Sequence, residues 1–222
     1  MAKVLGTVTI GQSPRVDLIP EMQAVMGTDV QVIEAGALDG MTLDEVRAIA
    51  PGSWDQVLVT RMADGTAVKI AERHILSKMQ DRIDGLAERG AQIIALVCTG
   101  EFPRFRCDRL LVRPQRVLYN AVSGLAEGLS LGVLIPDQDQ VGPAEARWHG
   151  AAARVKAYAA SPYGAVEEVR RGAAILREWG AQLIAMDCIG YTLAMKAMVR
   201  EETGVPVVLA RSIVARTIAE VM

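Results

Sequence analysis

Two cysteines, Cys98 and Cys188, occupy the same position in a segment that occurs twice in the chain. Residues 86–100 read LAERGAQIIALVCTG and residues 176–190 read LREWGAQLIAMDCIG, with nine identities in fifteen positions and no gap. The offset between the cysteines is 188 − 98 = 90 residues, which indicates an internal duplication and is too long for a solenoid repeat. We therefore predict two duplicated halves, each of which delivers one thiol to a site between them.

Two opposed thiols have a specific chemical use. A thiol at the end of a strand and the start of a helix lies near positive backbone N–H groups, which lower its pKa below the free value of ~8.5. One thiolate can then remove a proton from carbon while the opposite thiol supplies one, and this inverts a stereocentre without a cofactor. The backbone amides that follow the cysteines are expected to bind a carboxylate and stabilise its enediolate: Thr99, Gly100, Ile189 and Gly190.

Other uses of the cysteines have less support. A single cysteine that ends an apolar strand is most often a small buried hydrophobe, but here two fall at equivalent positions. A disulfide between them does not suit a reducing compartment. A metal site is not expected, because His74 and His149 fall in predicted helices and no ligand spacing is present. Cys107 has no counterpart in the repeat and is taken as incidental.

Further candidates for substrate binding follow the ends of other strands. Gly11, Gln12, Ser13 and Arg15 come after the first strand. Ser13 followed by Pro14 is typical of a helix N-cap with a first-turn proline, whereas the forked guanidinium of Arg15 suits a substrate carboxylate. Two more candidates are Arg61, at the end of another predicted strand, and Tyr191, which either lines the pocket or packs in the core.

Each cysteine is positioned by a helix and a strand. Apolar residues spaced by three and four predict helices over 75–86 and 166–176, and Gly90 and Gly180 fit left-handed caps at the helix ends. Buried strands follow at 93–97 and 183–186 and stop at Cys-x-Gly. The remaining predictions are strands at 5–10, 131–135, 110–113 and 205–209, closing helices at 114–126 and 211–221, and an inserted hairpin at 57–62 and 66–71 with an Asp-Gly turn.

Helices that alternate with strands predict an α/β fold with mainly parallel sheets. We predict two pseudo-symmetric α/β lobes, an N-terminal lobe over 1–129 and a C-terminal lobe over 130–222. The C-terminal helix is a candidate for crossing back to the first lobe. Ligands of open α/β sheets bind beyond the carboxyl ends of the strands, which is where both thiols fall.

The composition excludes several classes of function. The 222 residues are 51% hydrophobic and carry a formal net charge of −2, whereas a nucleic-acid or anionic-membrane surface needs a basic excess. No stretch approaches the ~20 apolar residues of a membrane-spanning helix, and the N-terminus is typical of a strand rather than a signal peptide. With three cysteines, an odd number that favours reduced thiols, a cytoplasmic protein is expected.

Several short motifs resemble those of the AroM family. They are TIGQSPR at 9–15, GALDG at 36–40, LVTR at 58–61, CTGEF at 98–102, DCIGY at 187–191 and ARSIVAR at 210–216, which together span almost the whole chain. That family is similar to the aspartate/glutamate racemase superfamily, which includes hydantoin racemases, maleate isomerases and arylmalonate decarboxylases. The resemblance implies a cofactor-independent, two-lobed α/β enzyme with cysteines on opposite sides of a carboxylate-binding cleft, and Cys98 and Cys188 match that pair.

The chain departs from racemases of that superfamily next to both cysteines and after the first strand. Thr99-Gly100 stands where Asn-Thr is usual, and Cys188 is followed by neither Thr-His nor Gly-Gly. After the first strand, Gly11-Gln12-Ser13 stands where an Asp-Ser pair is common. The substrate is therefore left open beyond a small carboxylate-bearing molecule, and homo-oligomers are an open option. The leading hypothesis is a two-thiol racemase or epimerase. The alternatives are a one-thiolate cis/trans isomerase, a decarboxylase with a cysteine proton donor, and a non-catalytic regulatory protein that binds a small anion.

Overall fold

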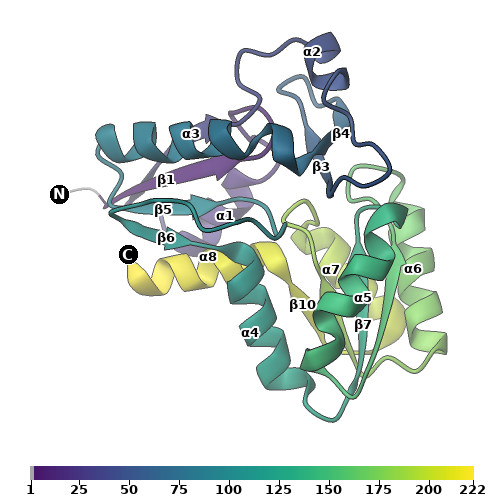
Figure 1. The fold of residues 1–222 in the computed structure, drawn as a ribbon. Coiled ribbons are helices and arrows are strands. Elements are labelled where there is room, and N and C mark those ends of the chain that lie inside the picture. Colours follow the sequence, from purple (N-terminus) through teal and green to yellow (C-terminus); the bar gives the residue numbers. More distant parts are fainter. Residues whose placement is uncertain (1–2) are drawn as a thin grey trace. The chain divides into compact units, whose positions relative to one another are not determined.

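A computed structural model describes residues 3–222 and divides the chain into two compact units. The first unit runs to Pro114 and also includes Arg216–Met222, and the second is Gln115–Ala215. Each unit contains a four-stranded parallel sheet with helices packed on it (Figure 1). The fold is therefore α/β with mainly parallel sheets, as predicted.

The sheet of the first unit has the order β2-β1-β5-β6. Helix α3 packs on this sheet with its buried face of Met79, Ile83 and Leu86, and the inserted hairpin stands beside helix α2 (Figure 1). The elements in chain order are β1 (Lys3–Thr9), α1 (Ile19–Met26), β2 (Val30–Gly36), α2 (Leu43–Arg47), β3 (Val57–Arg61), β4 (Ala67–Ala71), a 3₁₀ turn (Glu72–His74), α3 (Leu76–Glu88), β5 (Ile93–Leu96) and β6 (Leu110–Val112).

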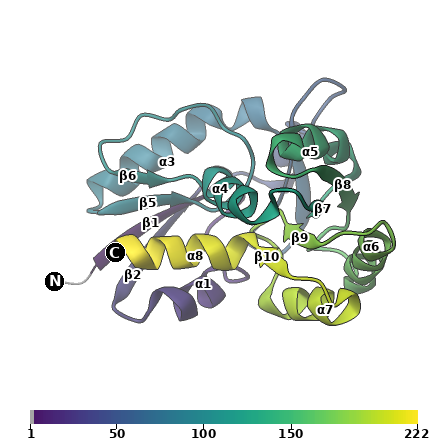
Figure 2. The same cartoon turned by 90° about the horizontal axis from the view of Figure 1, so that it is seen from below.

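The sheet of the second unit has the order β10-β9-β7-β8. Helix α5 packs on β7 and β8, and α6 and α7 pack on each other (Figure 2). The elements are α4 (Pro114–Ala126), β7 (Ser130–Ile135), a 3₁₀ turn (Gln138–Gln140), α5 (Val141–Trp148), a 3₁₀ turn (His149–Ala151), β8 (Arg154–Ala159), α6 (Val166–Glu178), β9 (Leu183–Met186), α7 (Leu193–Thr203), β10 (Val207–Leu209) and α8 (Ala210–Val221).

The sequence repeat corresponds to a structural repeat. The order β2-β1-β5-β6 becomes β8-β7-β9-β10 when each strand is replaced by its counterpart. The register is also the same. Leu5 pairs with Ile93 in one sheet, and Leu131 pairs with Leu183 in the other; Ile93 and Leu183 occupy the same position in the sequence repeat. The two halves are thus built on one topology, with the hairpin β3–β4 present only in the first.

Packing explains why Gly-Ala-Gln occurs in both copies. Gly90 and Gly180 have φ of 89° and 94°, which glycine adopts without a Cβ penalty. The next residue, Ala91 or Ala181, packs on a glycine of the neighbouring strand, Gly6 or Gly132. A Cβ added to that glycine would lie only 3.0 or 3.2 Å from the Cβ of the alanine. The side-chain oxygens of Gln92 and Gln182 then accept hydrogen bonds from the backbone N–H groups of Val4 in β1 and Ser130 in β7, each at 3.0 Å. These three identities therefore hold a helix against a sheet.

The chain divides after Pro114, and within the second unit Tyr119 of α4 stacks on Trp148 with the ring centroids 5.3 Å apart. One detail differs from the predictions. The prediction of an N-cap at Ser13 is wrong, since α1 begins at Ile19. Both donors of Ser13 are instead taken by the carboxylate of Asp39, at 2.7 and 2.8 Å.

Candidate active site

In the first unit, Cys98 lies just beyond the end of β5 and is partly exposed. Its side chain packs against the core of this unit, and its sulfur accepts the backbone N–H of Gly100 at 3.3 Å. A Cβ on Gly100 would lie only 3.0 Å from Leu58 and 3.1 Å from Phe102. Glycine therefore lets the backbone turn back tightly enough to donate to the thiol.

In the second unit, Cys188 has the same geometry beyond the end of β9. It is also partly exposed, and its sulfur accepts the N–H of Gly190 at 3.3 Å. A Cβ on Gly190 would lie 2.7 Å from the hydroxyl of Tyr163 and 2.8 Å from Pro162. Tyr163, which the sequence analysis did not select, is thus beside the Cys-x-Gly turn and is an additional candidate for contact with a ligand.

The two turns create similar environments for the sulfur atoms. An N–H group that donates to sulfur favours the negatively charged thiolate over the thiol. Both turns stand at the carboxyl ends of parallel strands, the usual ligand-binding edge of open α/β sheets. Each unit by itself therefore presents a partly exposed sulfur in a position suited to accept or donate a proton.

A buried carboxylate precedes Cys188 but not Cys98. Asp187 has a side chain only 2% exposed, and it accepts hydrogen bonds from Arg147 at 2.5 Å and from the indole of Trp148 at 2.9 Å. The equivalent residue of the first repeat is Val97. Sequence reasoning missed this ion pair because its partners, on α5, are about 40 residues away in the chain.

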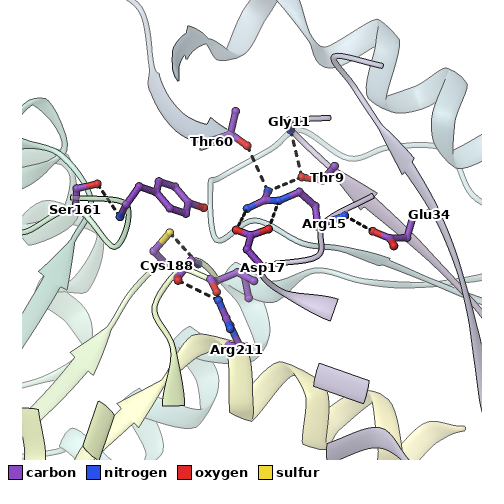
Figure 3. A network of polar contacts seen from close by, with 12 residues as sticks. Thr9, Gly11, Arg15, Asp17, Glu34, Thr60, Ser161, Cys188 and Arg211 are labelled. Atoms are coloured by element: carbon purple, nitrogen blue, oxygen red, sulfur yellow. Dashed lines mark hydrogen bonds and ion pairs between the residues drawn. The ribbon is translucent and has the colours of Figure 1, made fainter. Parts of the chain in front are cut away.

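Two more residues shape the turn after Cys188. Arg211, in the first turn of α8, donates to the carbonyls of Ile189 at 2.9 Å and Gly190 at 3.0 Å (Figure 3). Tyr191 is completely buried, and its hydroxyl donates to the carbonyl of Ala160 at 2.5 Å. Burial raises the pKa of Tyr191 well above its usual value. Tyr191 is therefore a neutral packing residue in the core of the second unit.

In the first unit, Arg15 is 3% exposed and forms an ion pair with Asp17 (Figure 3). Its Nε and Nη2 donate to the two carboxylate oxygens at 2.8 Å each, and its Nη1 donates to the hydroxyls of Thr9 and Thr60 at 2.9 and 3.4 Å. Burial by itself would raise the pKa of Asp17, but the hydrogen bonds and charge of Arg15 outweigh it and lower that pKa. Arg15 thus directs its charge to a carboxylate of the protein.

Gly11, Gln12 and Ser13 join neighbouring segments. A Cβ on Gly11 would lie 2.4 Å from the carbonyl oxygen of Arg61. The amide of Gln12 donates to two carbonyls of the loop after β2 at 3.1 and 2.8 Å, and its oxygen accepts from Ala63 at 2.9 Å. Their contacts within the unit hold the loop after β1 against the hairpin and the loop after β2.

Arg61 is brought to the same end of the first unit. It ends β3, and its carbonyl accepts the N–H of Gln12 at 3.1 Å. Its positive charge contributes to the lowered pKa of Asp17, after the larger effects of Arg15. Arg61 and the Arg15–Asp17 pair therefore share one electrostatic environment.

Within residues 3–222, no group of three or more His, Cys, Asp or Glu side chains is arranged to hold a metal ion. In that same part of the chain, no helix combines the length and apolar character needed to cross a membrane. His74 and His149 each lie in a short 3₁₀ turn.

The whole fold has counterparts among solved structures. Aspartate racemase from Picrophilus torridus is 10% identical, with a TM-score of 0.61 over 99% of this chain and 94% of that one. Glutamate racemase from Aquifex pyrophilus is 13% identical, with a TM-score of 0.61 over 99% and 84%. Unliganded arylmalonate decarboxylase is 14% identical, with a TM-score of 0.60 over 98% and 92%. At these identities the similarity establishes the fold.

Sequence comparisons add one further finding. A protein-family model described as "AroM protein" matches residues 5–222, almost the full chain. No curated protein sequence gives a significant match.

Proposed function

The chain belongs to the AroM family, and from that premise and its paired thiols we propose a cofactor-independent racemase or epimerase that acts on a carbon beside a carboxylate. The observation that carries the proposal is the duplicated Cys-x-Gly turn. Both sulfurs lie beyond equivalent parallel strands, and each accepts an N–H from the second following residue at 3.3 Å. A buried structural cysteine needs neither the partial exposure nor the repeated donor.

The reaction balances without an external redox group. One sulfur, as thiolate, takes the proton on the α-carbon and becomes a thiol. The electron pair of the broken C–H bond moves into the carboxylate and gives an enediolate. The second cysteine, as thiol, donates its proton to the opposite face of the carbon and becomes a thiolate. The proposal requires Cys98 and Cys188 to approach the substrate from opposite sides.

Backbone amides and one arginine are proposed to bind the carboxylate. The N–H groups of Thr99 and Ile189 are the proposed donors to the enediolate oxygens, because those of Gly100 and Gly190 donate to the sulfur atoms. Arg61 is the proposed cationic ligand, since Arg15 forms a two-point ion pair with Asp17. The proposed substrate is a small carboxylic acid, and the proposed compartment is the cytoplasm, where thiols stay reduced.

The fold similarity supports this class of reaction. Two of the solved structures with this fold are described as racemases and one as a decarboxylase. Equivalent turns at both cysteines favour a mechanism with two thiols over one with a single thiolate. The one-thiolate isomerase, the decarboxylase and the anion-binding regulatory protein are outcomes that the following experiment separates.

The proposal is tested by α-proton exchange. A panel of chiral carboxylic acids is incubated with the protein in deuterated water and followed by NMR. We expect one acid to exchange its α-proton and lose optical activity. Cys98→Ser and Cys188→Ser should each lower racemisation by several orders of magnitude, because a serine hydroxyl is a far weaker base at neutral pH. Cys107→Ser is the matched control and should retain full activity.

The pattern of loss distinguishes the mechanisms. In a two-thiol racemase, each single variant retains exchange from one enantiomer only, since the remaining thiol serves one face. A single-thiolate enzyme loses all chemistry with one replacement and is merely slowed by the other. Unchanged turnover in both variants would contradict every cysteine mechanism. Ligand binding without exchange or carbon dioxide release would favour a regulatory protein.

A further inference from the structure

A buried arginine supports the turn that carries Cys188. Arg211 is 2% exposed, and its Nε and Nη2 donate to the carbonyls of Ile189 and Gly190 at 2.9 and 3.0 Å. A guanidinium remains protonated at any physiological pH. A full positive charge is therefore held against the backbone one and two residues beyond the cysteine.

This contact affects both the geometry and the charge at the sulfur. The two carbonyls belong to the peptide groups on either side of Gly190, so holding them limits rotation of the Cys-x-Gly turn. The N–H of Gly190 stays directed at the sulfur of Cys188, 3.3 Å away. A nearby cation also favours the thiolate, because an opposite charge stabilises the ionised form of a titratable group. Figure 3 shows Arg211 reaching from α8 toward this turn.

The arginine that follows the last strand of the first unit makes a different contact. Arg113 follows β6, directly before α4, and donates to the carbonyl of Phe102. That carbonyl is four residues beyond Cys98, whereas the acceptors of Arg211 are one and two residues beyond Cys188. The two turns therefore share the N–H donor to sulfur, but the arginine contact lies closer along the chain to Cys188 than the Arg113 contact lies to Cys98.

Other titratable groups also lie around Cys188. Asp187 precedes the cysteine and would disfavour a thiolate, but its carboxylate is paired with Arg147 and hydrogen-bonded to Trp148. Tyr191 is buried, and its hydroxyl donates to the carbonyl of Ala160. The hydroxyl of Tyr163 lies beside Gly190, 2.7 Å from the place a Cβ on that glycine would take. Arg211 thus brings a cation to a turn whose neighbouring carboxylate, Asp187, is bonded to Arg147 and Trp148.

We propose that Arg211 is a positioning residue for Cys188 and makes Cys188 the more thiolate-rich of the two cysteines at neutral pH. In the proposed isomerase, Cys188 is then the resting base and Cys98 the resting acid. That assignment of roles rests on the proposed function. The inequality of the two thiols does not depend on it.

The unmodified protein provides the first test. Iodoacetamide, a small neutral reagent, is reacted with the full chain from pH 5 to 10, and each cysteine is quantified by peptide mass spectrometry. We expect Cys188 to show the lower midpoint in its rate profile, with Cys98 as the internal reference. Equal midpoints, or a lower midpoint at Cys98, would overturn the proposal.

Two variants test the role of the guanidinium. Arg211→Met should slow alkylation of Cys188 at pH 7 by about tenfold, which corresponds to a shift of about one pH unit in its profile, and leave Cys98 unchanged. Arg211→Lys retains the charge without the two-point contact, so a smaller loss is expected. Circular dichroism checks that the variants are folded. If Arg211→Met does not fold, the unmodified protein and Arg211→Lys decide the question.

The alternative results have defined meanings. A folded Arg211→Met protein with an unchanged Cys188 profile contradicts the proposal. Equal slowing at both cysteines also contradicts it, because that pattern reports a general loss of structure. Since alkylation needs no substrate, arginine-dependent reactivity at Cys188 can hold even where no carboxylic acid exchanges its proton. In that case the proposed function fails and the inference about Arg211 stands.

Discussion

Removal of the carboxylate of Asp187 should destabilise the second unit strongly. The Asp187 side chain is 2% exposed and that of Arg147 is 19% exposed, so their ion pair is largely shielded from water. Asp187→Ala leaves a partly buried guanidinium without its carboxylate and removes the acceptor of the Trp148 N–H. The loss of one partner from a buried pair costs about 3–5 kcal/mol. We expect a decrease of that size in the free energy of unfolding.

The measurement is urea unfolding followed by tryptophan fluorescence. Trp148 is 1% exposed and therefore reports on unfolding around Asp187, whereas Trp54 is fully exposed. Asp187→Asn keeps an oxygen acceptor for the indole without the charge, and its loss should be intermediate. Asp44→Ala is the control, because the side chains of its ion pair with Arg47 are exposed, where such pairs contribute little.

A double-mutant cycle tests the cause directly. If the loss comes from a stranded guanidinium, Arg147→Met should recover part of the stability in the Asp187→Ala background. A loss below about 1 kcal/mol for Asp187→Ala, which is the range of exposed ion pairs, would refute the reasoning. A large loss with no coupling to Arg147 would show that the hydrogen bond to Trp148 matters more than the charge.

Two further predictions concern packing and pH. A methyl group at Gly6 or Gly132 would lie 3.0–3.3 Å from the helix and loop packed on it, so Gly→Ala at either position should lower the free energy of urea unfolding by about 1–3 kcal/mol. Gly85 has open space around it, so Gly85→Ala should stabilise α3 by up to about 1 kcal/mol. The charge and hydrogen bonds of Arg15 lower the pKa of Asp17 below its usual 3.8 in the folded protein. The contribution of the Arg15–Asp17 pair to the free energy of unfolding is therefore complete above pH 3.8 and is lost as the pH falls through the lower pKa of the folded state. Asp17→Asn should therefore destabilise less at acid pH than at pH 7, and an equal effect at both would contradict this.

The duplication and most of the fold were predictable from local patterns. Most strands, the helices that end before Gly90 and Gly180, and the hairpin with Gly65 at φ 88° follow from the spacing of apolar residues and from these turn residues. Strands β2 and β8 were not among the predicted strands. The repeat placed Cys98 and Cys188 beyond equivalent strands, and the structure has them there. The family assignment also held, because the motifs that indicated it extend through almost the whole chain.

The roles of individual polar residues were less accessible. Ser13 was predicted to cap a helix, but Asp39 takes its donors. Arg15 was a candidate for the substrate carboxylate, but its guanidinium binds Asp17, two residues along. The type of a side chain limits which partners it can bind. The partner it does bind depends on which groups the fold brings within about 3 Å.

The architecture and the position of the two thiols could be predicted from the chain alone, because both depend on periodicity and on a visible repeat. The surroundings of each thiol could not be predicted in this way, because they depend on tertiary contacts. Arg211 approaches the turn at Ile189 and Gly190 from α8, and Arg147 reaches Asp187 from α5. These partners are separated by about 20 to 40 residues, so no local pattern encodes their pairing. They become neighbours only when parallel strands align the ends of distant segments at one edge of a sheet.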